Sequence, residues 1–175
     1  MCRKIPPAIT PNQITSLGLI FSLVGGCVFG LGKAQLAGLL LLAAGFFDLL
    51  DGACARSRGQ ITQFGAFWDS TIDRYSDLIV MGGITISFAR VGQILYVLLS
   101  VIATAGFVMI SYTKARAENI IGSCTVGLME RPERILVLSA GSIVNCLKPT
   151  IWILAILCHQ TVVHRIWFTY KKTRI

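Results

Sequence analysis

The chain has 175 residues, of which 54% are hydrophobic and only 14% are charged, and its formal net charge is +8. Soluble domains carry about 25% charged residues, so the composition excludes an ordinary soluble enzyme and predicts an integral membrane protein. In such a protein a positive charge is typical of basic loops near anionic lipid rather than of nucleic-acid binding, and we expect one all-α membrane domain over residues 1–175 with no nucleic-acid partner.

Six apolar segments predict a bundle of six transmembrane helices, each of which needs about 20 residues. They cover residues 14–32, 36–55, 68–88, 91–112, 135–147 and 151–168. The fifth segment is short, and because proline suits the first turn of a helix, we expect this helix to begin near Pro132. Gly26 and Gly30 in the first segment, and Gly38 and Gly45 in the second, indicate close helix packing.

The distribution of Lys and Arg predicts the orientation, because positive residues stay cytoplasmic. With both termini inside, only Lys33, Arg90 and Lys148 fall on the far side, against 13 basic residues on the cytoplasmic side. The cytoplasmic set is Arg3, Lys4, Arg56, Arg58, Arg74, Lys114, Arg116, Arg131, Arg134, Arg165, Lys171, Lys172 and Arg174. The acidic residues lie at or toward the same side, so we expect an active site that faces the cytoplasm.

Aspartates gather at the inner ends of the second and third predicted helices. They are Asp48 and Asp51, three residues apart, followed by Asp69, Asp73 and Asp77 at spacings of four. Residues at these spacings share a helix face, and a charge that faced lipid would cost about 2.5–3.5 kcal/mol, so the carboxylates should meet in a polar cavity. Clustered carboxylates repel one another unless a cation lies between them. Hard divalent cations, chiefly Mg²⁺ with Mn²⁺ as the alternative, match such a site, and two metals can share its oxygens.

Two other interpretations of the aspartates stay open. They could pair with Arg56, Arg58 and Arg74 to hold a loop at the membrane interface, although a loop does not require so many aligned acids. They could also bind ions in transit through a cation transporter or channel. That interpretation leaves Gly52 and Gly65 unexplained, since glycine in a helix costs about 1 kcal/mol relative to alanine but lets a ligand such as a nucleotide diphosphate approach the backbone.

The segment from Asp48 to Asp73 carries a signature with fixed spacing. It agrees at every fixed position with D-x2-D-G-x2-A-R-x8-G-x3-D-x3-D, and it thereby resembles the CDP-alcohol phosphotransferase family. The resemblance implies six transmembrane helices, commonly dimeric, around a cytoplasm-facing polar cavity. It also implies transfer of a phosphate-bearing lipid group from a CDP-lipid, CDP-diacylglycerol or CDP-archaeol, to an alcohol, with release of CMP.

The resemblance implies a role for each aspartate of the signature. Asp48, Asp51 and Asp69 are implied metal ligands, and Asp73 lies beside the metals, as a further ligand and as the general base. Metals would stabilise CMP as the leaving group, while a carboxylate in reach of the acceptor hydroxyl takes its proton. Asp77 lies outside the signature and is expected to support the ligands without binding metal.

A nucleotide site is implied as well. Its residues are Gly52, Ala55, Arg56 and Gly65. The segment TPNQIT is similar to the entry segment of the family, in which Asn12 and Thr15 reach the nucleotide. An interpretation of equal weight is a helix that starts at Pro-Asn with Thr15 as its cap.

Basic residues outside the signature indicate the acceptor. The motifs SYTKARAE and ERPER place Lys114, Arg116, Arg131 and Arg134 at the inner ends of two predicted helices. Their side chains match a phosphate dianion, so we expect a phosphorylated alcohol, although ordinary positive-inside charge explains any one of them alone. The motifs resemble the branch that makes inositol-phosphate lipids, which favours inositol 1-phosphate.

Glycerol 3-phosphate is the alternative acceptor. Phosphatidylglycerophosphate synthases usually carry D-P-x-A-D-K where this chain has Asp69-Ser-Thr-Ile-Asp73-Arg74. Because of that difference, glycerol 3-phosphate is less favoured than inositol 1-phosphate as the acceptor, but it stays open as an alternative.

Overall fold

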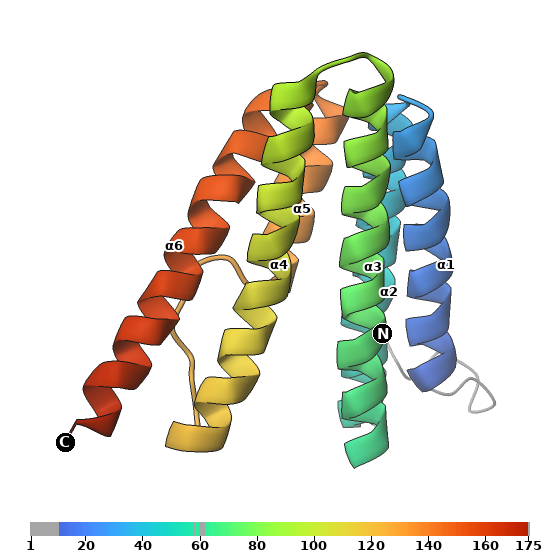
Figure 1. The fold of residues 1–175 in the computed structure, drawn as a ribbon. Helices are drawn as coiled ribbons and strands as arrows, with labels where there is room; N and C mark the ends of the chain where they lie inside the picture. The colour runs from blue at the N-terminus through green and yellow to red at the C-terminus, as the bar shows by residue number, and fades with distance from the viewer. Residues whose placement is uncertain (1–10, 58, 60–61, 175) are drawn as a thin grey trace.

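The computed structural model describes residues 11–57, 59 and 62–174, and this part of the chain is helical without strands. The helices are α1 (Pro11–Gly30), α2 (Ala34–Ser57), α3 (Gln63–Arg90), α4 (Ile94–Ile121), α5 (Arg131–Ile143) and α6 (Leu147–Thr173). In Figure 1, α1, α2 and α3 stand together on one side, and α4, α5 and α6 form a second group. In the first group α1 packs against α2 and α3. Helix α5 packs against α6 of its own group and also against α2, and so joins the two groups.

Four helices, α1, α2, α4 and α6, are long and apolar enough to cross a membrane. These helices identify an integral membrane protein and an all-α fold. Helix α3 is equally long, but its first half carries the aspartates and Arg74. Helix α5 has only 13 residues, about 20 Å at 1.5 Å per residue, which is less than the roughly 30 Å of a bilayer core.

Of the six helices expected from the sequence, the fifth agrees least with the structure. It begins at Arg131 with Pro132 in its first turn, as expected, but it ends at Ile143, and Leu147 already belongs to α6. Asn145 adopts a positive φ of 60° in the tight turn between them, which ends α5 early. In Figure 1 the segment 122–130 rises from the lower end of α4 before α5 begins, so the start of α5 lies inside the bundle.

Glycines at the expected positions allow the helices to approach closely. A Cβ at Gly26 would lie 2.7 Å from Cγ2 of Ile79, and one at Gly38 would lie 2.9 Å from Cβ of Ser142. Gly45 faces α5 in the same way. The packing role that the sequence predicts for these three glycines is confirmed. Gly26 lets α1 approach α3, whereas Gly38 and Gly45 let α2 approach α5.

A pair of adjacent glycines in α3 tests this packing. A Cβ at Gly83 would run into the carbonyl oxygen of Gly26, whereas nothing lies within 4 Å of a Cβ at Gly82. Gly83→Ala should therefore lower the free energy of unfolding by about 1–3 kcal/mol, as overpacking usually does. Gly82→Ala should be neutral or stabilising, because alanine favours a helix. Thermal unfolding of the two variants in detergent compares them, and equal midpoints would contradict the packing.

Candidate active site

The aspartates of α2 and α3 come together at one end of the bundle because both helices pack against α1. Carboxylate oxygens of Asp48, Asp51 and Asp69 all lie within 4.8 Å of one another. Asp51 is 5% exposed, and the other two are half-buried. The acidic cluster that the sequence predicts is therefore present, and we call these three residues the carboxylate set.

The carboxylate set fits a hard divalent cation. It offers oxygen ligands only, which Mg²⁺ and Mn²⁺ accept. Oδ1 of Asp69 is buried and has no hydrogen-bond partner among the described residues. A buried carboxylate oxygen without a partner is costly, and a cation within the set would remove that cost.

Thr15 orients one member of the carboxylate set. Its hydroxyl donates a hydrogen bond of 2.5 Å to Oδ2 of Asp51 across the contact between α1 and α2. The helix starts at Pro11, as a Pro-Asn start predicts, but Thr15 lies inside it, so the interpretation of Thr15 as a cap is wrong. The side chain of Asn12 lies outside the described part of the structure.

Asp73 lies next to the carboxylate set but pairs with an arginine. Oδ1 of Asp73 is 2.7 Å from Nη1 of Arg131, and the same nitrogen pairs with Oδ1 of Asp48. The structure thus does not place Asp73 among the three carboxylates that converge, although the sequence predicts it as a fourth ligand. Its carboxylate stands between the carboxylate set and the basic residues described next.

A cavity of about 390 Å³ opens among α3, α4, α5 and α6, and Arg131, the ion-pair partner of Asp73, is part of its lining. Three of the four basic residues expected at the acceptor site line it, Lys114, Arg131 and Arg134. Two more line it that the sequence did not assign to the acceptor, Arg74 and Arg165. The lining acids are Glu118 and Glu130, so positive charge predominates, and we call this space the basic cavity.

Arg116 does not belong to the basic cavity. It is two residues from Lys114 on α4, and residues at that spacing do not share a helix face. Arg116 instead lines a separate groove of about 270 Å³ between α4 and α6. The prediction that it joins the other three at one phosphate is wrong, because the helical period turns Arg116 away from Lys114.

Arg134 is held by its surroundings. It is 1% exposed, its Nη2 lies 3.1 Å from Oδ2 of Asp77, and its Nη1 donates a 3.0 Å hydrogen bond to the carbonyl of Phe107. The guanidinium also stacks 4.4 Å from the centre of the Phe107 ring. Asp77 thus fixes a residue of the cavity wall, and the support of the metal ligands that the sequence predicts for it stays a prediction.

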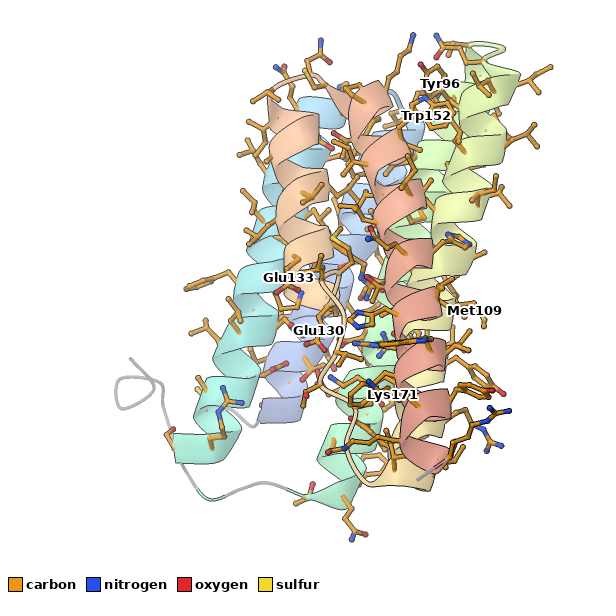
Figure 2. The ribbon with its side chains drawn as sticks, turned by 90° about the vertical axis from the view of Figure 1, so that its left-hand side faces the viewer. Tyr96, Met109, Glu130, Glu133, Trp152 and Lys171 are labelled. Atoms are coloured by element: carbon orange, nitrogen blue, oxygen red, sulfur yellow. The ribbon has the colours of Figure 1, made fainter. Side chains whose placement is uncertain are left out.

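Arg165 fixes the segment that leads into α5. Its three nitrogens reach the carbonyl of Val126 at 2.9 Å, the carbonyl of Ile110 at 2.6 Å and Oε1 of Glu130 at 3.0 Å. Glu130 also accepts from Lys114 at 3.0 Å, and Figure 2 shows it at the lower end of α5. Arg165 is not among the acceptor residues expected from the sequence, although an arginine in an apolar helix is itself a signal of a polar cavity.

The structure describes some, but not all, of the side chains expected around a nucleotide. Gly52 faces the guanidinium of Arg56, whose Nη1 would lie 3.2 Å from a Cβ there. The N–H of Gly65 donates to the hydroxyl of Thr62, the N-cap of α3, at 2.9 Å. The side chain of Ala55 lies outside the described residues.

The ion pairs argue against a role of the aspartates in seating a loop. Among the described side chains, Asp48, Asp73 and Asp77 pair with Arg131 and Arg134 of α5. Arg56 and Arg74 have no such pair with another described residue, and Arg58 lies outside the described part of the chain. Because the pairs converge on the basic cavity, the aspartates belong to a site inside the bundle.

Comparisons with known proteins agree with this geometry. Residues 8–170 match the family model of CDP-alcohol phosphatidyltransferase. An archaetidylinositol phosphate synthase of Pyrococcus horikoshii is 37% identical over 94% of this chain and 85% of its own. A phosphatidylinositol phosphate synthase of Mycobacteroides abscessus is 36% identical over 89% of this chain and 75% of its own.

Solved structures give the same result. The phosphatidylinositol phosphate synthase of Mycobacterium tuberculosis with CDP-DAG bound superimposes with a TM-score of 0.86 at 33% identity, over 93% of this chain and 87% of that one. The same enzyme in complex with manganese and citrate gives a TM-score of 0.83 at 34% identity, over 93% and 83% of the two chains.

Proposed function

The chain belongs to the CDP-alcohol phosphatidyltransferase family, and on that premise we propose that it transfers the phosphatidyl-type group of a CDP-lipid to inositol 1-phosphate and releases CMP. The similar proteins named above make inositol-phosphate lipids, and one of them binds CDP-DAG. The observation that carries the proposal is the basic cavity beside Asp73. A phosphorylated alcohol can place its phosphate there while its hydroxyl faces the carboxylates.

In the proposed reaction Asp73 accepts the proton of the acceptor hydroxyl. The hydroxyl oxygen then forms a bond to the phosphorus that bears the lipid, and the bond from that phosphorus to the CMP oxygen breaks. Asp48, Asp51 and Asp69 would hold the divalent cation, and the hydrogen bond from Thr15 would fix the carboxylate of Asp51 for that role. Mg²⁺ is the proposed cation, and when bound it supplies positive charge that offsets the diphosphate and the leaving CMP.

The donor would lie with its nucleotide near the ends of α2 and α3. We assign it to the signature residues and to the start of α1. These residues are Asn12, Thr15, Gly52, Ala55, Arg56 and Gly65. The guanidinium of Arg56 lies close to the backbone of Gly52, which suits a phosphate that approaches both.

The basic cavity would recognise the acceptor through charge. Lys114 is 38% exposed and therefore accessible to a ligand, while Arg131 and Arg134 lie deeper in the same wall. Guanidinium and ammonium donors each contribute about 1.5–3 kcal/mol in a hydrogen bond to a charged group. A neutral alcohol such as serine or free inositol would leave these cations without a partner.

Lys114→Gln should raise the KM for inositol 1-phosphate by roughly tenfold or more, the equivalent of one charge-assisted bond. The KM for the CDP-lipid should change little. Arg116→Gln is the matched control, because Arg116 is on the same helix but faces the other groove. Initial rates of CMP release give both constants. If Arg116→Gln raised the acceptor KM as much as Lys114→Gln, the cavity would be misassigned.

The proposal includes the membrane arrangement and the dimer that are implied by the resemblance to the family. Six helices would lie in the membrane as one domain over residues 1–175, with the short α5 among the longer helices. Both termini and the active site would be cytoplasmic, and two chains would form a homodimer. The excess of basic residues toward one side supports that orientation.

The experiment that tests the function is an assay of the purified protein for CMP release from a CDP-lipid with Mg²⁺ and inositol 1-phosphate. We expect release that requires all three components and stops when the metal is chelated. A cation transporter or channel would instead give ion flux without CMP. Flux without CMP release for every acceptor would overturn the proposal.

A further inference from the structure

Arg131 lies between the carboxylate set and the basic cavity. Its Nη1 pairs with Oδ1 of Asp48 and lies 2.7 Å from Oδ1 of Asp73. The same side chain lines the basic cavity together with Lys114, and it is only 13% exposed. One guanidinium therefore faces both sites.

On the carboxylate side this guanidinium supplies positive charge. Asp48 belongs to the carboxylate set, whose oxygens converge within 4.8 Å, and such close negative charges repel one another without a cation. A divalent cation bound to the set would compete with Arg131 for Asp48, and the two positive charges would repel. Metal binding should thus loosen the contact between Arg131 and Asp48.

Arg131, which lines the basic cavity, also has a donor that no described residue engages. Its Nε is buried and has no hydrogen-bond partner among the described residues. The planar fork of a guanidinium matches two oxygens of a phosphate. A guanidinium that is less engaged by Asp48 would be a stronger phosphate ligand, because its charge would no longer be shared between two carboxylates.

We propose that Arg131 is the counter-cation of the metal-free site and that it couples metal binding to acceptor binding. A divalent cation on Asp48, Asp51 and Asp69 shifts the guanidinium toward the basic cavity and raises the affinity of the cavity for the acceptor phosphate. The inference rests on the proposed function, which places that phosphate in the basic cavity. By linkage the phosphate must raise the affinity for the metal by the same factor.

The test is a titration of the purified protein with Mn²⁺, followed by electron paramagnetic resonance without CDP-lipid and with or without inositol 1-phosphate. In the unmodified protein inositol 1-phosphate should tighten Mn²⁺ binding about tenfold, within the usual range of coupling between sites. Arg131→Gln should bind Mn²⁺ more tightly than the unmodified protein when inositol 1-phosphate is absent, since the competing charge is gone. It should bind inositol 1-phosphate more weakly, and the coupling should be lost.

Lys114→Gln is the control, because Lys114 lines the cavity and pairs with Glu130 rather than with the carboxylate set. It should weaken inositol 1-phosphate binding, leave the Mn²⁺ affinity unchanged and retain the coupling at saturating ligand. A purely structural role of Arg131 would weaken both ligands together, so the opposite shifts identify the counter-cation. If Arg131→Gln does not fold, Arg131→Lys is used, which should keep the charge and retain only part of the coupling.

Mn²⁺ binding that is unchanged or weaker in Arg131→Gln would overturn the inference, even if the variant releases CMP. Absence of coupling in the unmodified protein, or full coupling in Arg131→Lys, would overturn it as well. Failure of CMP release with every acceptor would instead overturn the proposed function, and the Mn²⁺ affinities measured without inositol 1-phosphate would still decide whether Arg131 competes with metal.

Discussion

Asp73→Asn should lower the rate of CMP release by about 10²–10⁴-fold, the usual contribution of a general base. The amide cannot accept the proton of the acceptor hydroxyl, whereas Asp48, Asp51 and Asp69 remain to hold the metal and the donor. Binding of the CDP-lipid should therefore stay measurable. Single-turnover rates and equilibrium binding of the CDP-lipid separate the two effects.

Asp77→Asn is the matched control for Asp73→Asn. Asp77 is the next acid on the same face of α3, and it pairs with Arg134 at 3.1 Å. An amide of the same shape can still lie beside that guanidinium, so most of the turnover should persist. If Asp73→Asn kept near-normal turnover, or if Asp77→Asn lost as much, the general base would be assigned to the wrong residue.

Asp51→Asn should weaken metal binding by about 10–100-fold or more, because even residues that only orient metal ligands have effects of that size. Asp51 is 5% exposed and lies within the carboxylate set, so the substitution removes one of the three carboxylates that converge there. Metal-dependent binding of the nucleotide should fall with it, and excess Mg²⁺ should restore part of that binding. Titration with Mn²⁺ measures the metal affinity directly.

The control for Asp51→Asn is Glu118→Gln. Glu118 lines the basic cavity but does not belong to the carboxylate set. Glu118→Gln removes the same charge as Asp51→Asn, so a general electrostatic effect would change the metal affinity in both variants alike. An unchanged metal requirement in Asp51→Asn would remove that residue from the metal site.

The carboxylate set could be predicted from the sequence because it depends mainly on the spacing of residues within single helices. Spacings of three and four residues place Asp48 with Asp51, and Asp69 with Asp73, whatever the rest of the fold does. A short connection between α2 and α3 then brings the two helix ends together. The fixed spacing of the signature adds an independent argument for the same residues.

The pairing of Asp73 and Asp48 with Arg131 could not be predicted in this way. It depends on the segment 122–130, which rises into the bundle before α5 begins, and no hydropathy pattern reveals such a path. The same path explains why α5 is shorter than a membrane span. Arg165 fixes that segment from α6, 39 residues from Val126, and only the tertiary structure relates such distant residues.

Selectivity among acceptors tests the central claim most directly. Inositol 1-phosphate, free inositol, glycerol 3-phosphate and serine should be compared side by side for CMP release, with the same CDP-lipid and Mg²⁺. We predict a strong preference for inositol 1-phosphate over free inositol, because only the phosphorylated form can pair with the cations of the basic cavity. A preference for glycerol 3-phosphate would keep the phosphate site and change the acceptor, whereas a preference for serine or free inositol would contradict the claim that the cavity binds the acceptor phosphate.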